Sequence, residues 1–179
     1  MINAINFFDG VDLQSTSYFI FCYIYIYIYT REFLIIILII SLFAILFLNY
    51  TKKIFQGDSG IFFYTFILGC YFIKSNNLEL LDTENIILIC MLPIIDMLRV
   101  FILRIINKKH LMVGDLEHMH HLLKKKFSSL TGVLISLGLA FIPLIIYEIL
   151  DLFLISLFLG IVFYFIIIFY CYYKFREKK

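Results

Sequence analysis

The chain has 179 residues, of which 63% are hydrophobic and 16% are charged, and its mean hydropathy is +1.00. A soluble domain is about half apolar and about a quarter charged, so this composition excludes an ordinary soluble core, a disordered chain and a secreted disulfide scaffold. The net charge of only +2 gives no argument for nucleic acid as a partner.

Six apolar segments approach the length of a membrane span. A helix needs about 20 mostly apolar residues to cross roughly 30 Å of hydrocarbon. We predict spans at residues 13–30, 31–50, 59–74, 85–106, 129–148 and 151–173, with short or charged connections between them. The sequence therefore predicts an all-α, polytopic transmembrane bundle of about six helices, in which residues 1–179 form a single membrane domain.

The first predicted span has an ambiguous pattern, because Tyr and Ile alternate from Tyr23 to Tyr29. In a soluble protein this period of two favours a strand. An open strand in lipid would leave backbone groups unpaired, and the sequence has no second alternating segment with which to close a barrel. We therefore predict a helix here.

Basic residues are divided unevenly between the two predicted sides of the membrane. Placing both termini and the loops at 51–58 and 107–127 on one side collects there every Lys and Arg except Arg31 and Lys74. Because membrane proteins concentrate Lys and Arg in cytoplasmic loops, this side is predicted to be cytoplasmic. We expect a multi-pass protein of the cytoplasmic (inner) membrane with both termini in the cytoplasm.

Polar residues gather in three clusters on the predicted cytoplasmic face. Their sequences are NAINFFDGVD at residues 3–12, GDSG at 57–60 and DLEHMHH at 115–121. Taken singly, Asn and Asp are common helix caps, and a histidine-rich loop beside lysines suits a headgroup-facing surface. Three such clusters on one face are also what a site for a charged, phosphate-bearing substrate needs.

The first two clusters carry oxygen ligands that suit a hard cation. Asn6, Asp9, Asp12 and Asp58 have the amide and carboxylate groups that Mg²⁺ accepts beside substrate phosphates. Gly57 lets the backbone approach a ligand closely, and the helix that starts there presents unsatisfied N–H groups to an anion. These residues predict a site for a magnesium-bound pyrophosphate.

The third cluster carries imidazoles inside a basic loop. His118, His120 and His121 could bind phosphate or sugar hydroxyls, or transfer protons near neutral pH. Zinc is the weaker alternative, since on a helix His120 would point away from the other two and no cysteine lies nearby. Within the fourth predicted span, Asp96 and Arg99 lie three residues apart on one helical face, and we expect them to form a structural ion pair.

Together the three clusters resemble the signatures of a known family, the polyprenyl-phosphate N-acetylhexosamine-1-phosphate transferases of the WecA, TagO and MraY type. NAINFFDGVD resembles the family's NAxNxxDGxDG, IFQGDSG its FxGDxG turn, and DLEHMHH its DxxHxHH segment. The order of the three and their common predicted side also agree. Leu13 departs from the pattern, which has Gly at that position.

The resemblance implies transfer of a sugar 1-phosphate from a UDP-sugar to a polyprenyl (undecaprenyl) phosphate, with release of UMP. Such a reaction initiates cell-envelope glycans such as lipopolysaccharide or teichoic acid. Mg²⁺ is the implied cofactor, with Mn²⁺ as an alternative ion. The site residues implied by position are Asp9, Asp12 and Asp58 for catalysis, Asn6 and Asp58 for the metal, and Asn3, Asn6, Gly57, His118, His120 and His121 for substrate binding.

Two other functions remain open. One is an MraY-like transfer of a phospho-muramoyl-pentapeptide, which is disfavoured because Met119 interrupts the histidines. The other is a non-catalytic membrane subunit or fragment whose polar loops bind metal or lipid headgroups.

The resemblance covers the C-terminal part of the family pattern. Family members carry further spans before the first motif, with a loop that contains an adjacent Asp pair, and this sequence has no adjacent Asp pair. We therefore expect an N-terminally truncated transferase that lacks activity alone. Its expected partner is a separate N-terminal half or a second copy of the chain.

Overall fold

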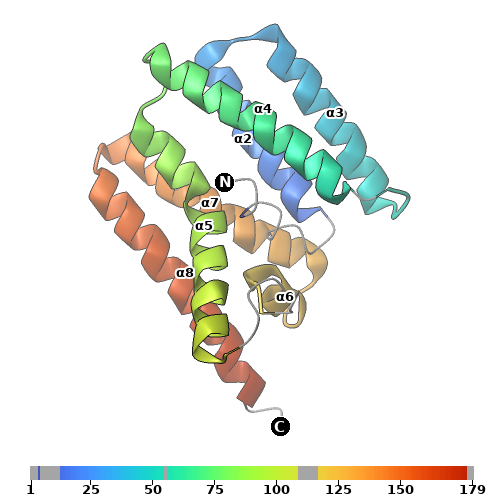
Figure 1. Ribbon diagram of the computed structural model, residues 1–179, viewed down its shortest axis with the longest axis vertical. Coiled ribbons are helices and arrows are strands. Elements are labelled where there is room, and N and C mark those ends of the chain that lie inside the picture. Colours follow the sequence, from blue (N-terminus) through green and yellow to red (C-terminus); the bar gives the residue numbers. More distant parts are fainter. Residues whose placement is uncertain (1–3, 5–12, 55, 109–116, 177–179) are drawn as a thin grey trace.

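The computed structural model describes residues 4, 13–54, 56–108 and 117–176 (Figure 1). All regular structure within these ranges is α-helical, which confirms the predicted all-α bundle. The helices are α2 (Gln14–Thr30), α3 (Phe33–Tyr50), α4 (Gly57–Asn77), α5 (Thr83–Ile106), α6 (Met119–Lys124), α7 (Ser129–Leu150) and α8 (Phe153–Arg176).

Each of the six predicted spans coincides with a helix, and the short α6 is an addition that was not predicted. Within the described ranges, four helices are long and apolar enough to cross a membrane: α3, α5, α7 and the Phe153–Tyr173 part of α8. Helix α2 has 17 residues, and α4 has polar residues at both ends. Membrane crossing by α2 and α4 therefore stays a prediction.

Helix α2 is central to the bundle, since it packs against α3, α4 and α7, while α5 and α8 pack against α7 and against each other (Figure 1). Its buried tyrosines join neighbouring helices by hydrogen bonds. The Tyr18 hydroxyl donates to the Ile89 carbonyl at 2.8 Å, and the Tyr23 hydroxyl to the Tyr64 carbonyl at 2.7 Å. The alternating segment is thus a helix, as predicted, and its hydroxyls are used for contacts between helices.

A second group of tyrosines fixes the other end of α2. Tyr25 and Tyr29 are four residues apart on one helical face, and both hydroxyls donate to the Glu148 carboxylate on α7. The Asn85 side chain on α5 donates to the same carboxylate at 2.7 Å. This cluster ties α2, α5 and α7 together at the end that is predicted to face outward.

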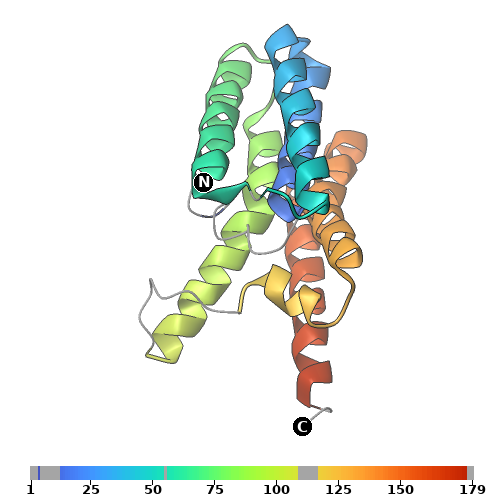
Figure 2. The ribbon, with the colours of Figure 1, turned by 90° about the vertical axis from the view of Figure 1, so that its right-hand side faces the viewer.

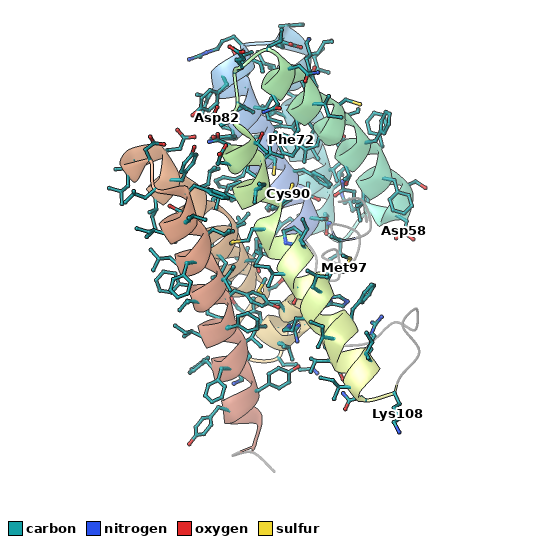
Figure 3. All side chains as sticks on the ribbon, turned by 60° about the vertical axis from the view of Figure 1, so that its left-hand side comes forward. Asp58, Phe72, Asp82, Cys90, Met97 and Lys108 are labelled. Carbon is teal, nitrogen blue, oxygen red and sulfur yellow. The ribbon has the colours of Figure 1, made fainter. Side chains whose placement is uncertain are left out.

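The two polar segments that the structure describes lie toward one end of the bundle. In Figure 2 the first turn of α4 and the short α6 face the lower end, away from the turns that join α2 to α3 and α4 to α5. Figure 3 shows Asp58 level with the middle of α5 near Met97, while Asp82 lies toward the opposite end from Lys108. Which side of the membrane this end faces stays a prediction.

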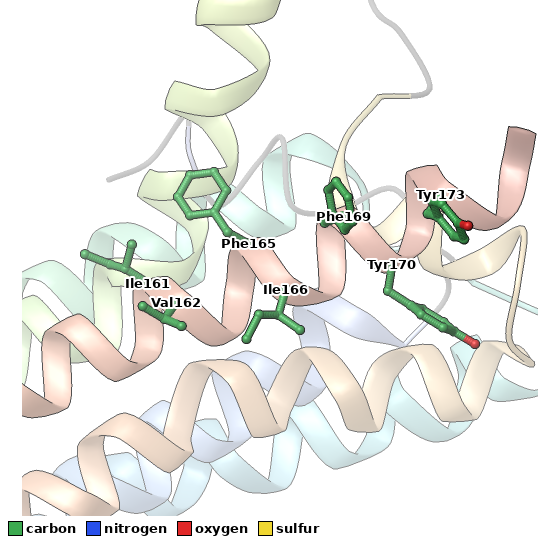
Figure 4. Close-up of a pocket in the computed structure, with 7 residues that line it drawn as sticks. All are labelled: Ile161, Val162, Phe165, Ile166, Phe169, Tyr170 and Tyr173. Carbon is green, nitrogen blue, oxygen red and sulfur yellow. The ribbon is translucent and has the colours of Figure 1, made fainter.

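The C-terminal half of α8 presents an apolar and aromatic face (Figure 4). A shallow pocket on this face is lined by residues of α8 alone, namely Ile161, Val162, Phe165, Ile166, Phe169, Tyr170 and Tyr173. Because a single helix supplies the whole lining, we interpret it as a lipid-facing surface. Its tyrosines suit the membrane interface, where aromatic rings with a polar group are common.

Helices α5, α7 and α8 approach one another closely at Gly160. A Cβ atom placed there would lie 2.6 Å from Met91 Cε and 2.8 Å from Pro143 Cγ, whereas one placed at Gly138 would meet its nearest neighbour at 3.5 Å. We expect Gly160→Ala to lower the free energy of unfolding by about 1–3 kcal/mol, because the proline ring cannot move aside.

Thermal unfolding in detergent measures this effect, and Gly138→Ala is the matched control. The control is expected to be neutral or slightly stabilising, since alanine favours helix over glycine by about 1 kcal/mol. Equal midpoints for the two variants would contradict the close approach at Gly160.

Candidate functional site

Except for Ala4, the first motif lies outside the described residues, and so do its Asn3, Asn6, Asp9 and Asp12. The second motif opens α4. Gly57 has a φ of +64°, in the left-handed region where a side chain would be strained, and the Asp58 side chain is exposed in the first turn of the helix. A carboxylate there is stabilised by the helix dipole and is accessible to a ligand.

The residue before the second motif connects it to the start of α2. The Gln56 Oε1 atom accepts a hydrogen bond from the Thr16 hydroxyl at 2.8 Å and another from the Ser15 hydroxyl at 3.3 Å. Ser15 and Thr16 follow closely on Asp12, the last acid of the first motif. The structure therefore holds the second motif against the segment that directly follows the first, a contact that sequence reasoning missed.

The predicted ion pair between Asp96 and Arg99 is confirmed. The Arg99 Nη2 atom lies 2.8 Å from Asp96 Oδ1, and both side chains are buried, with exposed fractions of 8% and 2% for Arg99 and Asp96. Tyr164 on α8 completes the cluster, because its hydroxyl accepts from Arg99 Nε at 2.6 Å and donates to Asp96 Oδ1 at 2.8 Å. These hydrogen bonds satisfy charges that would otherwise be costly to bury.

The Asp96–Arg99 pair also binds residues 117–121, here called the histidine segment. The sequence did not predict this contact. Arg99 Nη2 donates to the Glu117 carbonyl at 2.6 Å, and the Met119 N–H donates to the Asp96 carboxylate at 3.1 and 3.2 Å. Helix α5 continues beyond Asp96 to Ile106, about 15 Å further along the axis. The histidine segment is thus held part-way along α5, at Asp96, whose neighbour Met97 lies near the level of Asp58 in Figure 3.

The three histidine rings lie together, so the expectation that His120 points away is wrong. The His120 ring stacks on the His118 ring with centroids 5.7 Å apart and planes 3° apart, and its centroid is 4.1 Å from that of His121. His118 is the N-cap of α6 and has extended backbone. The helical spacing on which that expectation depended therefore begins only at Met119.

His120 is the most deeply buried of the three rings, with 2% of the residue exposed. Among the described residues neither of its ring nitrogens has a hydrogen-bond partner. Burial, followed by repulsion from His121, lowers the pKa of His120 to about 3, although the Asp96 carboxylate acts in the opposite direction. His120 is therefore neutral at physiological pH.

We expect this depressed pKa to make stability depend on pH. The unfolded chain binds a proton at His120 below about pH 6.5, whereas the folded chain does so only near pH 3. The contribution of His120 is thus fully present above about pH 6.5 and is lost as the pH falls toward 3. Unfolding midpoints at pH 7 and pH 5 measure this loss, and His120→Asn should reduce the difference between them.

One described residue at this end of the bundle is a predicted ligand of Mg²⁺. Asp58 offers an exposed carboxylate, an oxygen donor of the kind that Mg²⁺ prefers. Across the described residues no group of three or more His, Cys, Asp or Glu side chains has the geometry of a metal site. The other predicted metal ligand, Asn6, lies outside these residues.

Comparison with known proteins gives one match to a family model. Residues 1–76 match the family model described as glycosyl transferase family 4, which confirms the predicted resemblance over the first two motifs. The matched segment ends before the histidine segment. No curated protein and no solved structure matches the chain.

Proposed function

Because residues 1–76 match glycosyl transferase family 4, we propose that this chain carries the cytoplasmic site of a sugar-phosphate transferase. The substrates are a UDP-sugar, of the UDP-N-acetylhexosamine type, and a polyprenyl phosphate in the membrane. The products are UMP and a polyprenyl diphosphate sugar, with which cell-envelope glycan synthesis begins.

One observation carries the proposal beyond the family match. The backbone of the histidine segment forms hydrogen bonds with Asp96 and Arg99, which lie part-way along α5. Asp58, at the start of α4, is exposed and lies near the level of Met97, the neighbour of Asp96 on α5 (Figure 3). In an apolar helix bundle, a carboxylate and several imidazoles of this kind suit the binding of a diphosphate substrate with its cation.

The chemistry follows from the charges of the reactants. An oxygen of the polyprenyl phosphate attacks the sugar-linked phosphorus of the UDP-sugar, and the bond to the bridging oxygen breaks, so that UMP leaves with the electron pair. Both reactants are anions, and their repulsion has to be offset. Bound Mg²⁺ would supply that neutralisation, with Asp58 and Asn6 as its proposed ligands.

The remaining residues of the proposed site bind and orient the substrates. His118 and His121 are the proposed partners of the substrate phosphates and sugar, and the exposed Lys124 offers a positive charge at the end of α6. Asp9 and Asp12 are proposed as acids of the nucleotide and catalytic site. Catalysis then consists mainly of positioning and charge stabilisation.

Limited proteolysis of the full chain tests this proposal. Trypsin can cut after Lys53, which precedes the second motif, and after Lys124, the last residue of α6. Cleavage after Arg31 and Lys74, at the opposite end of the bundle, serves as the internal control. We expect a UDP-N-acetylhexosamine with Mg²⁺ to slow cleavage at the first pair and to leave the second pair unchanged.

The other outcomes separate the alternatives. Protection by a UDP-linked muramoyl pentapeptide in place of UDP-N-acetylhexosamine would favour the MraY-like reaction. Protection by Zn²⁺ alone, without any UDP-sugar, would contradict the transferase and favour a non-catalytic, metal-binding subunit.

A further inference from the structure

The Asp96 carboxylate has an unusual number of donors for a side chain inside an apolar helix bundle. Its Oδ1 atom accepts from Arg99 Nη2, the Tyr164 hydroxyl and the Met119 N–H, and its Oδ2 atom lies 2.9 Å from His118 Nδ1. Asp96 is 2% exposed and His118 is 4% exposed. The contact between the two side chains is therefore shielded from water.

This arrangement determines where the His118 ring carries its hydrogen. The carboxylate beside Arg99 is ionised and can only accept hydrogen bonds. His118 Nδ1 must therefore be the donor in its contact with Asp96. Since Nδ1 is committed to that contact, Nε2 carries no hydrogen in the neutral ring, and it can meet a ligand only by accepting a hydrogen bond.

We propose that Asp96 is a positioning residue of the transferase site, which acts through His118. It fixes the ring with its hydrogen on Nδ1 and so orients Nε2 as an acceptor for a hydroxyl of the nucleotide sugar. This role rests on the proposed function for its ligand, but the state of the ring can be measured without any substrate. Buried carboxylates that hold a histidine ring by one nitrogen serve the same purpose in metal sites and in catalytic triads.

Two helices support Asp96 in this role. Arg99, one turn along α5, neutralises its charge and also binds the Glu117 carbonyl, so the backbone before His118 is held by the same pair. Tyr164 holds the carboxylate from α8. The ring is therefore positioned by a cluster that spans α5, the start of α6 and α8.

Nitrogen-15 NMR of the full chain, labelled at histidine and held in detergent micelles, tests the first half of the proposal. At about pH 8.5, where an ordinary histidine is neutral, we expect Nδ1 of His118 to carry the hydrogen in the wild-type protein. Asp96→Asn should lower the preference for this tautomer by more than about tenfold, because a neutral amide can pair with either tautomer.

Two further variants separate positioning from general loosening. Tyr164→Phe removes one hydrogen bond to Asp96 but keeps the carboxylate, so the His118 tautomer should persist. Asp151→Asn makes the same chemical change in the turn between α7 and α8, at a left-handed residue that Asn tolerates, and should leave the spectrum unchanged. A wild-type His118 without a hydrogen on Nδ1 would overturn the proposal, even if Asp96→Asn failed to fold.

The affinity of the same micelles for UDP-N-acetylhexosamine with Mg²⁺ tests the second half. We expect Asp96→Asn to weaken binding about tenfold and Asp151→Asn to leave it unchanged. Unchanged affinity in a variant whose His118 tautomer has become mixed would overturn the positioning role. Absence of binding by the wild-type protein would instead contradict the proposed function, and the tautomer measurement would still decide whether Asp96 fixes the ring.

Discussion

Asp58→Asn is expected to lower the rate of sugar-phosphate transfer by a factor of about 10²–10³, measured in membranes whose transfer activity depends on this chain. Asp58 is exposed in the first turn of α4, so the substitution removes a negative charge without opening a cavity. The loss of its interaction with the helix dipole costs stability of only about 0.3–1 kcal/mol. The expected effect is therefore on chemistry and metal binding.

Asp151→Asn serves as the control for this substitution, because Asp151 is equally exposed but lies at the opposite end of the bundle. It should leave turnover unchanged. If Asp58→Asn kept wild-type turnover at saturating Mg²⁺, Asp58 would have no part in the reaction.

Asp96→Leu is expected to have the largest effect on stability. The substitution leaves the buried Arg99 guanidinium without its carboxylate and removes the acceptor for the Met119 N–H. Breaking a buried pair in this way costs about 3–5 kcal/mol, because a charge then stays unpaired. The measurement is the free energy of unfolding, from denaturant titration of the protein in mixed micelles.

Two comparisons make this result specific. The double variant Asp96→Leu/Arg99→Met should recover part of the loss, since it leaves no unpaired charge. Lys74→Met removes the exposed Lys74–Glu32 ion pair, in which the lysine side chain is 53% exposed, and should cost less than about 1 kcal/mol. Equal decreases in the free energy of unfolding for Asp96→Leu and Lys74→Met would contradict a stabilising role of the buried Asp96–Arg99 pair.

The helices could be predicted from sequence because their causes are local. Apolar length locates each span, and the need to pair backbone groups in lipid decides in favour of helix from Tyr23 to Tyr29. The Asp96–Arg99 pair was predictable for the same reason, because three residues of helix set its spacing.

The contacts of the histidine segment could not be predicted in this way. Asp96 and His118 are 22 positions apart and lie on different elements, so no local spacing sets their contact. Helix α6 has six residues, too few for a periodic pattern. Because the sequence does not reveal that α6 starts at Met119, it could not show that the His118 and His120 rings stack. One usable signal was present, since a buried carboxylate in an apolar span needs partners beyond a single arginine.

We propose that Asp58 and the histidine segment lie together on the cytoplasmic side of the membrane. Single cysteines at the exposed positions Ser59, Lys124 and Glu79, introduced after replacement of the four native cysteines, test it by labelling with a membrane-impermeant maleimide. We expect Ser59→Cys and Lys124→Cys to react only after the cells are permeabilised, and Glu79→Cys to react in intact cells. Labelling of Ser59→Cys and Lys124→Cys from opposite sides of the membrane would contradict it.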